Sequence, residues 1–259
     1  MEPRLFIFDL DGVIYRGEEP MPYAAETVQR LRAEGKLVRF LTNNSALTRE
    51  SYVRRLTQMD IPCTEEDFMT SAYATALYLQ SQGATGKRVF IVGEEGIYEE
   101  LRRIGMKVVT DPEEEGADYV VAGIDRRFTY DKLRRAHYAI WHGARFIATN
   151  RDATYPASGG RIVPGGGAIV AAIATCTGVE PLVIGKPNTY SMELLLQRCG
   201  VSPQEAVLVG DRLDTDVLVG KRAGLHTVLV LTGVTDEEAV RSAPEEMLPE
   251  RVIRTLAEL

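Results

Sequence analysis

Cysteine is scarce in this chain of 259 residues, which also contains only three histidines and one tryptophan. The three cysteines, Cys63, Cys176 and Cys199, lie far apart and form no Cys-x-x-Cys pair. Because no such pair exists, a zinc site is not expected, and an odd number of widely spaced cysteines does not imply a disulfide framework. Each cysteine has apolar neighbours and is predicted to be a small core residue.

Long apolar runs and an excess of basic charge are also missing. No run reaches the roughly 18 residues that suggest a membrane span, so no membrane partner is expected. The chain enters a strand-like segment without a basic and then apolar leader, which predicts no signal peptide and a cytoplasmic location. The net charge of −7 argues against nucleic acid as a partner. A phosphorylated small molecule remains compatible with it, because a local cation can dominate a site.

Strand-like and helix-like segments alternate along almost the whole chain. Residues 5–8 and 37–41 read as buried strands, and a helix-like stretch between them stops at Gly35. Such alternation predicts an α/β protein with a parallel sheet. A polar break at residues 83–87 marks an expected domain boundary, and residues 88–180 hold a second α/β series. A helix is expected to run from about residue 64 to residue 82, and residues 182–184 read as a strand.

Two aspartates follow the first strand. Asp9 and Asp11 stand one residue apart, and Gly12 comes next, where a sharp turn or a close approach favours glycine. Neighbouring carboxylates repel each other unless a cation or a shared proton relieves them. Asp-Gly is also a common turn dipeptide, so a plain polar strand end is the competing interpretation of this stretch alone.

Other predicted strands also end in polar side chains. In a parallel sheet the carboxyl ends of the strands share one edge, so distant residues can converge there. Carboxylates at that edge suit Mg²⁺, and a hydroxyl, amides and a lysine suit phosphoryl oxygens. A carboxylate nucleophile can form an aspartyl-phosphate. The candidate residues are Asp9, Asp11, Thr42, Asn43, Lys186, Asp211, Asp214 and Asp216.

Four stretches, at residues 9–13, 41–45, 185–187 and 210–216, resemble in this order the four motifs of the haloacid dehalogenase (HAD) superfamily. The insertion resembles the C2-type cap of subfamily IIA, which contains p-nitrophenyl phosphatase, nucleotide monophosphatase and pyridoxal phosphatase-like enzymes. Residues 92–97 and 148–152 strengthen this likeness. The resemblance implies a Rossmann-like core formed by residues 1–80 and 182–259, with residues 81–181 as a cap that sets substrate specificity.

The resemblance also implies roles for individual residues. Asp9 would attack phosphorus, and Asp11 would protonate the leaving oxygen and then activate water. Thr42 and Asn43 would hold phosphoryl oxygens, and Lys186 would neutralise charge on the nucleophile and the phosphoryl group. Taken singly, Lys186 is more simply a surface charge and Thr42 a strand-end residue.

A magnesium site follows from the same resemblance. Mg²⁺ would be held by Asp9, Asp211 and the backbone carbonyl of Asp11. Asp216 is expected in the outer shell, and Asp214 is expected to be a loop or capping residue, although the spacing alone does not settle which of the two approaches the metal.

The cap offers weaker candidates. Asn150 and Asp152 are candidate substrate contacts, although an Asn-x-Asp turn that stabilises its own loop explains them equally well. Residues 165–167 are three glycines before a helix, which we interpret as a tight loop because the spacing of a dinucleotide or ATP site is absent. The joins near residues 80 and 182 are predicted hinges. The resemblance is compatible with copies of the chain associating through the cap.

The predicted activity is Mg²⁺-dependent hydrolysis of small phosphorylated metabolites, such as sugar phosphates, nucleoside monophosphates or p-nitrophenyl phosphate. One alternative is a dehalogenase, which is disfavoured because members with that activity depart from the two-aspartate pattern. Another is a phosphoacceptor signalling module, which is typically about half as long and has no large insertion.

Overall fold

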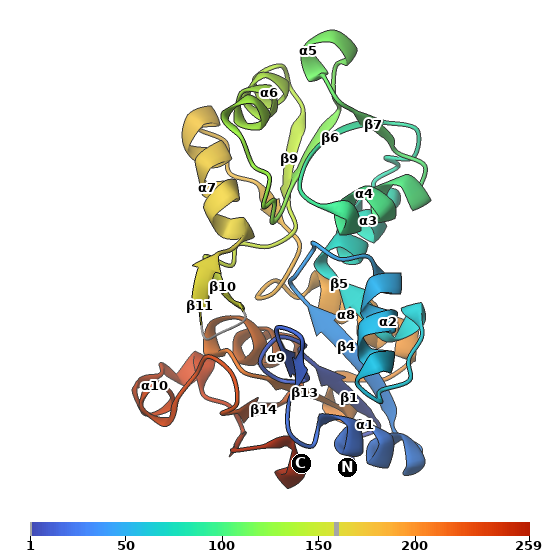
Figure 1. The fold of residues 1–259 in the computed structure, drawn as a ribbon, viewed down its shortest axis with the longest axis vertical. Coiled ribbons are helices and arrows are strands. Elements are labelled where there is room, and N and C mark those ends of the chain that lie inside the picture. Colours follow the sequence, from blue (N-terminus) through green and yellow to red (C-terminus); the bar gives the residue numbers. More distant parts are fainter. Residues whose placement is uncertain (1, 158–160) are drawn as a thin grey trace.

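The computed structural model describes residues 2–157 and 161–259, and it contains two parallel sheets placed one above the other (Figure 1). The larger sheet has β1 near its centre, flanked on one side by strands from the first 70 residues and on the other by strands from the last 54. The strands, in their order across this sheet, are β15 (Arg251–Ile253), β14 (His226–Val230), β13 (Ala206–Gly210), β1 (Leu5–Phe8), β4 (Leu37–Thr42) and β5 (Phe68–Thr70).

All neighbouring strands of the larger sheet run parallel. The strand order reverses direction at β1, and ligands of open α/β sheets bind outside the carboxyl ends at such a switch point. Strand β1 is buried on both faces. Its residues Phe6 and Phe8 pack with the helices of one face, and Leu5 and Ile7 with those of the other.

Helices cover both faces of the larger sheet. One face packs against α1 (Ala24–Ala33) and α2 (Arg49–Gln58), and the opposite face against α3 (Ser71–Ser81), α8 (Tyr190–Cys199) and α9 (Leu218–Ala223). The remaining helical elements near this sheet are short. They are η1 (Glu65–Asp67), η3 (Pro203–Glu205), the π-helical turn η4 (Leu213–Val217), α10 (Glu237–Ser242), η5 (Glu245–Met247) and η6 (Leu256–Glu258).

The smaller sheet is formed by the middle of the chain. Its strands, in their order across the sheet, are β12 (Leu182–Val183), β9 (Arg145–Ala148), β8 (Tyr119–Ala122), β6 (Arg88–Val92) and β7 (Lys107–Val109). Helices α3 and α4 (Glu95–Arg103) contribute to one hydrophobic cluster beside it, and α6 (Tyr130–Trp141) and α7 (Gly166–Thr177) to another. The other elements are α5 (Pro112–Glu115) and two hairpins, β2 (Tyr15–Arg16) with β3 (Glu19–Pro20) and β10 (Thr154–Ala157) with β11 (Arg161–Pro164).

The predicted α/β class and parallel core sheet are confirmed, whereas three local predictions are wrong. The continuous helix expected from residue 64 is interrupted by β5, whose three residues are buried against β4. Thr70 then caps α3 by accepting a hydrogen bond from the Tyr73 amide. Cys176 is exposed rather than buried. The strand at residues 182–183 pairs with β9 of the smaller sheet, so the core predicted to resume at residue 182 does not take up this strand.

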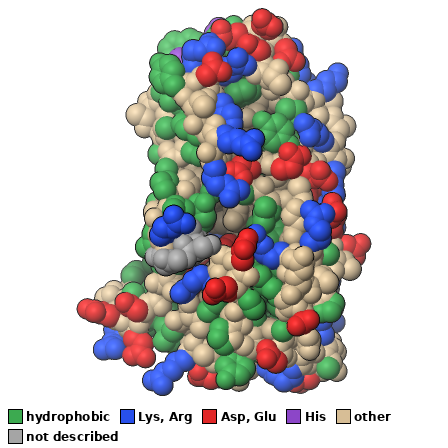
Figure 2. Space-filling model, viewed as in Figure 1, with side chains coloured by type: hydrophobic (Ala, Val, Ile, Leu, Met, Phe, Trp, Pro, Cys, Tyr) green, Lys and Arg blue, Asp and Glu red, His purple; other side chains and the backbone are tan. Residues whose placement is uncertain are grey.

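Surface charge is mixed. On the face shown in Figure 2, Lys and Arg side chains are interspersed with Asp and Glu over both sheets. None of the described helices combines the length and the apolar character needed to cross a membrane.

Candidate active site

Strand pairing brings Asp9 and Asp211 together at the carboxyl edge of the larger sheet. Asp9 directly follows β1 and Asp211 directly follows β13, and these strands pair with Phe8 opposite Val209. The Asp9 amide continues the ladder by donating to the Val209 carbonyl at 2.9 Å. The two aspartates are therefore neighbours although 201 residues separate them in the chain.

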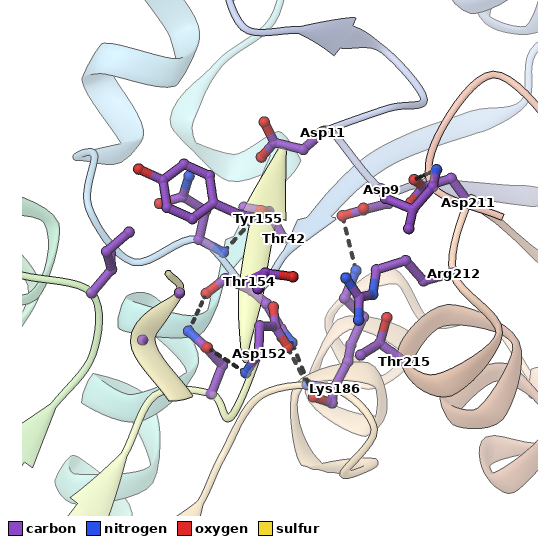
Figure 3. Close-up of a pocket in the computed structure, with 17 residues that line it drawn as sticks. Asp9, Asp11, Thr42, Asp152, Thr154, Tyr155, Lys186, Asp211, Arg212 and Thr215 are labelled. Carbon is purple, nitrogen blue, oxygen red and sulfur yellow. Dashed lines mark hydrogen bonds and ion pairs between the residues drawn. The ribbon is translucent and has the colours of Figure 1, made fainter. Parts of the chain in front are cut away.

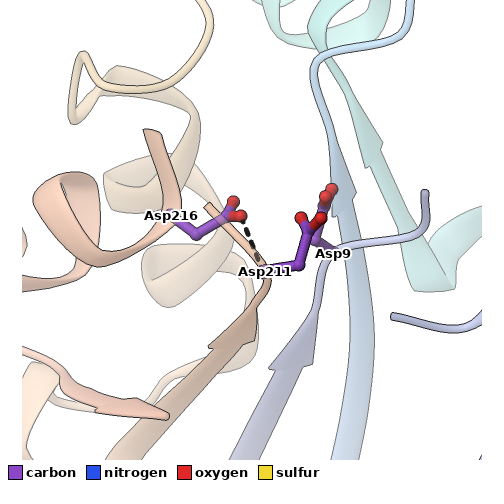
Figure 4. A group of neighbouring side chains, drawn as sticks. All are labelled: Asp9, Asp211 and Asp216. Carbon is purple, nitrogen blue, oxygen red and sulfur yellow. Dashed lines mark hydrogen bonds between the residues drawn. The ribbon is translucent and has the colours of Figure 1, made fainter. Parts of the chain in front are cut away.

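A third carboxylate, Asp216, joins them from the π-helical turn η4. Ligand atoms of Asp9, Asp211 and Asp216 all lie within 4.8 Å of one another (Figure 4). The Asp216 Oδ2 accepts hydrogen bonds from the amides of Asp211 and Arg212, at 3.2 and 3.1 Å. The η4 turn thus folds the motif back on itself and aims Asp216 at the end of β13.

The Asp211 carboxylate fits a metal ligand. Its Oδ2 accepts a hydrogen bond from the Val234 amide at 2.7 Å, whereas its Oδ1 is buried and has no hydrogen-bond partner among the residues that the structure describes. A buried carboxylate oxygen without a partner is costly unless a cation or donor meets it. Asp9 and Asp211 together offer the hard oxygen ligands that a divalent cation such as Mg²⁺ prefers.

Lys186 is buried within this group rather than exposed at the surface. Its Nζ donates to Asp216 Oδ1 at 2.6 Å, to Asp9 Oδ1 at 2.9 Å and to the Leu41 carbonyl at 3.4 Å. Burial lowers the pKa of this ammonium, but the charges of Asp216 and Asp9 outweigh that effect and raise the pKa above its ordinary value. Lys186 therefore stays charged and balances the neighbouring carboxylates.

Three carboxylates at this edge of the sheet have raised pKa values, because they are buried away from water and lie close to other carboxylates. Burial raises the pKa of Asp9 well above its ordinary value, although Lys186 opposes the shift. Burial and the charge of Asp216 raise the pKa of Asp211 to about 7. Burial also raises the pKa of Asp11 to about 6, against the opposing charge of Arg55. An added cation would relieve this repulsion.

Two glycines leave room for Asp211. Gly12 has a φ of +86°, and a Cβ there would lie 2.6 Å from Asp211 Oδ2. A Cβ on Gly233 would lie only 1.9 Å from the same oxygen. The close approach of both backbones keeps the Asp211 carboxylate in one place, and Gly233 has no counterpart among the predicted site residues.

Thr42 ends strand β4 and Asn43 follows it, and both are buried. The Thr42 hydroxyl accepts a hydrogen bond from the Asn44 amide at 3.0 Å and lines the cavity. The Asn43 side chain is engaged within the protein: its Nδ2 donates to the Lys186 carbonyl and to Asp152 Oδ1, both at 2.9 Å, and its Oδ1 accepts from the Lys186 amide at 2.8 Å.

Both cap candidates line the cavity, and both are hydrogen-bonded to Asn43. Asn150 is only 3% exposed, and its Nδ2 donates to the Asn43 carbonyl at 2.7 Å while its Oδ1 accepts from the Asp152 amide at 3.0 Å. Its side chain is therefore committed to internal contacts. Asp152 lines the cavity, with Oδ1 bound to Asn43. Asp214, by contrast, is exposed, forms an ion pair with Arg212 and lies outside the cluster of three carboxylates.

The cavity lies between the carboxyl edges of the two sheets (Figure 3). Several of its lining residues were not singled out from the sequence. Some, such as Ile124 and Tyr155, carry no recognisable motif, and others, such as Asn44 and Arg212, stand inside the motifs without an assigned role. One available signal is position, since Val234 follows the end of β14 and Ile124 the end of β8. The unpredicted lining residues are Asn44, Ile124, Thr154, Tyr155, Gly165, Gly166, Arg212, Thr215 and Val234.

Comparisons with known proteins agree with this geometry. A family model described as haloacid dehalogenase-like hydrolase matches residues 6–107, and a HAD-hydrolase-like model matches residues 183–259. The 5′-nucleotidase YutF of Bacillus subtilis is 38% identical over 253 residues, which cover 98% of this chain and 96% of that protein. The 4-nitrophenylphosphatase of Schizosaccharomyces pombe is 34% identical and aligns with 98% of this chain and 92% of its own length.

Solved structures show the same likeness. The p-nitrophenyl phosphatase from Archaeoglobus fulgidus superposes with a TM-score of 0.90 at 37% identity, covering 99% of this chain and 97% of that one. The glycerol phosphate phosphatase of Mycobacterium tuberculosis in complex with magnesium gives a TM-score of 0.91 at 34% identity, covering 99% and 76%. The chain belongs to the haloacid dehalogenase-like hydrolase family, and it is one of the metal-dependent phosphatases of that family.

Proposed function

We propose that this phosphatase uses Mg²⁺ to hydrolyse small phosphate monoesters through an aspartyl-phosphate formed on Asp9. The observation that carries the proposal is the contact of Lys186 with Asp9 beside the unpartnered oxygen of Asp211. A cationic side chain and a metal-binding carboxylate thus flank one nucleophilic carboxylate. That arrangement supports transfer of a phosphoryl group, whose charge must be stabilised on several oxygens.

Asp9 and Asp11 divide the chemistry. An Asp9 oxygen attacks phosphorus, the bond from phosphorus to the leaving oxygen breaks, and protonated Asp11 donates its proton to that oxygen. Asp11 then takes a proton from water as the water attacks the aspartyl-phosphate, which releases phosphate and restores Asp9. A pKa of about 6 suits both steps, because a general acid and base works best with a pKa near the operating pH.

Asp9 and Asp211 would hold Mg²⁺, with the backbone carbonyl of Asp11 as the third protein ligand. Bound there, the ion would orient the phosphoryl group and reduce its charge repulsion with Asp9. Thr42 and Lys186 would bind phosphoryl oxygens from the protein side. Asp216 would remain outside the metal's ligand set, because both of its oxygens already accept hydrogen bonds.

Substrates are proposed from relatives whose names span several small phosphate esters. These relatives include phosphoglycolate phosphatases of Arabidopsis thaliana, human glycerol-3-phosphate phosphatase and acid sugar phosphatase of Staphylococcus aureus. The leaving group would face Thr154 and Tyr155, which line the cavity from the cap side together with Asn150 and Asp152, whose side chains are hydrogen-bonded to Asn43.

We propose that the chain divides into a core and a cap, with hinges near both joins. The first join lies near residue 80, and the second follows residue 183, because β12 pairs with β9 of the smaller sheet. Equal cap angles in phosphate-free and phosphate-analogue-bound crystals would argue against the hinges. Association of copies of the chain through the cap stays a prediction. Sedimentation velocity of the full chain measures its oligomeric state.

The decisive experiment is turnover of a panel of phosphorylated metabolites with Mg²⁺ and with EDTA, by wild type and Asp9→Asn. We expect EDTA and Asp9→Asn each to abolish turnover. Asp214→Asn serves as a control, because Asp214 is exposed and pairs with Arg212. Turnover by Asp9→Asn would overturn the proposal. A stable phosphoprotein without turnover would support the signalling-module alternative.

A further inference from the structure

A cap loop reaches into the core beside the catalytic lysine. Strand β9 of the smaller sheet ends at Ala148, and the next residues, 149–152, lie against the core segment that follows β4. Thr149 donates its hydroxyl hydrogen to Ser45 Oγ at 3.1 Å, and Asn150 donates to the Asn43 carbonyl at 2.7 Å. The cap is thus bound at this point to the loop that carries Thr42 and Asn43.

Asn43 holds the backbone of Lys186 with its side-chain amide. Its Oδ1 accepts from the Lys186 amide at 2.8 Å, and its Nδ2 donates to the Lys186 carbonyl at 2.9 Å. This two-point contact mimics the pairing of two strands and fixes the origin of the lysine side chain. Asp9 and Asp216 fix its other end. Lys186 is therefore held at its backbone and at its ammonium group.

Asn43 is in turn held from the cap. Asp152 Oδ1 accepts a second hydrogen bond from Asn43 Nδ2 at 2.9 Å, so the amide hydrogens of Asn43 go to one core partner and one cap partner. Asn150 Oδ1 accepts from the Asp152 amide at 3.0 Å, which ties the two cap residues together. Asn43 and Asn150 are both buried, so these hydrogen bonds are protected from competition with water.

We propose that Asn150 and Asp152 are positioning residues, which act from the cap through Asn43 to align Lys186. This inference rests on the proposed role of Lys186 in phosphoryl transfer. It gives the cap a role besides substrate specificity. Contact between the cap and the core would complete the alignment of Lys186, a catalytic residue of the core. Enzymes commonly complete a catalytic site in this way when a lid closes.

The expected kinetic effect is on the chemical step. Small displacements of a catalytic group can cost about 100-fold in rate. We expect Asn150→Ala and Asp152→Ala each to lower kcat by roughly 10- to 100-fold, with the KM changed by less than about threefold. The fall should be the same for p-nitrophenyl phosphate and for glycerol phosphate, because Lys186 acts on the phosphoryl group that both share.

The conservative variant Asp152→Asn distinguishes a positioning role of Asp152 from a role of its negative charge. Asp152→Asn keeps an oxygen that can accept from Asn43 Nδ2, so it should recover kcat to within about threefold of wild type. If Asp152 instead acts by its charge on the leaving group, Asp152→Asn should fail like Asp152→Ala, and the losses should differ between the two substrates. That result would overturn the proposal for Asp152.

The decisive test combines Asn150→Ala with Lys186→Ala and measures residual turnover at high enzyme concentration. If Asn150 acts through Lys186, its loss should cost nothing further once the lysine is absent. Independent effects, with the double variant slower than Lys186→Ala by the full factor of Asn150→Ala, would overturn the proposal. The melting temperatures of all variants show whether each one is folded at the assay temperature.

Asn188→Ala is the matched control. Asn188 lies two residues beyond Lys186, is exposed, and donates to the Gly185 carbonyl at 3.4 Å without contacting Asn43. It should keep kcat within about twofold of wild type. If the proposed function is wrong, Lys186→Ala should keep full activity. If only the present inference is wrong, Lys186→Ala should be impaired and Asn150→Ala should be active.

Discussion

Lys186 Nζ lies 2.6 Å from Asp216 Oδ1, and both side chains are at most 2% exposed. The other oxygen of this carboxylate accepts hydrogen bonds from two backbone amides, so Asp216 links the lysine to the end of β13. The expectation from the sequence places Asp216 in the outer shell of a metal. The contact with Lys186 adds a second role, because the Asp216 carboxylate holds both the Lys186 ammonium and the loop that follows Asp211.

Asp216→Asn should lower kcat by about 10- to 100-fold, the usual cost of losing an outer partner of a catalytic group. An asparagine has one oxygen and one NH₂ group, so a donor would face either the Lys186 ammonium or the two amides that Asp216 now accepts. Steady-state kinetics with p-nitrophenyl phosphate measures the effect. Asp214→Asn again serves as the control, and equal rates for the two variants would contradict the assigned contact.

The metal-free protein should lose stability as the pH rises, in part through Asp211. Its pKa is about 7 when folded and about 4 when unfolded, so its contribution is fully present below pH 4 and lost as the pH rises through 7. In EDTA at pH 8, Asp211→Asn should raise the melting temperature by roughly 4–8 °C, and by much less at pH 5. Thermal denaturation measures this difference, and a shift independent of pH would contradict it.

Gly233→Ala should weaken metal binding by crowding Asp211. The added Cβ would lie 1.9 Å from Asp211 Oδ2, so the carboxylate or the backbone must move. We expect the Mg²⁺ concentration for half-maximal activity to rise by about 10- to 100-fold. Gly35→Ala is the control, because a Cβ there meets no atom within 4 Å and its positive φ costs stability alone. Unchanged Mg²⁺ dependence of Gly233→Ala would be the contrary result.

Arg49 and Glu100 form a buried ion pair that joins α2 beside the larger sheet to α4 beside the smaller one. Arg49 Nε lies 2.6 Å from Glu100 Oε1, and the side chains are 10% and 3% exposed. Glu100→Ala leaves the buried arginine charge to the more distant Glu65 carboxylate, 3.5 Å away, so the free energy of unfolding should fall by about 3 kcal/mol, the lower end of the cost of breaking a buried pair. Arg49→Met with Glu100→Leu should recover most of that loss. Urea unfolding of the wild type, Glu100→Ala and the double variant measures it, and a double variant no more stable than Glu100→Ala would refute the coupling.

Much of the fold and part of the site can be predicted from local patterns. The runs at β1 and β13 predict strands because each is buried and apolar on both faces of a parallel sheet, and the run at β4 is apolar except for Arg39 and its terminal Thr42. Polar residues at the ends of such strands must then share one edge. For this reason Asp9, Thr42 and Asp211 are found close together as predicted.

The missed features are those without a local pattern. The three residues of β5 are too few to show a period, and only their pairing with β4 makes them a strand. Asn43 reads as a polar strand-end residue, yet its amide is paired with the backbone of Lys186, 143 residues away. The space beside Asp211 that requires Gly233 exists only once both backbones have met.

The sequence by itself determined the chemistry available at the sheet edge: two aspartates after the first strand, a lysine, and an acidic motif after a later strand, in an order characteristic of the family. The tertiary structure alone decided which atoms meet. It placed Lys186 between Asp9 and Asp216 and bound Asn43 to the cap, and it left one Asp211 oxygen without a hydrogen-bond partner in the described part of the chain. Residue types follow from the chain, whereas hydrogen-bond partners depend on distances and angles between segments that only folding brings together.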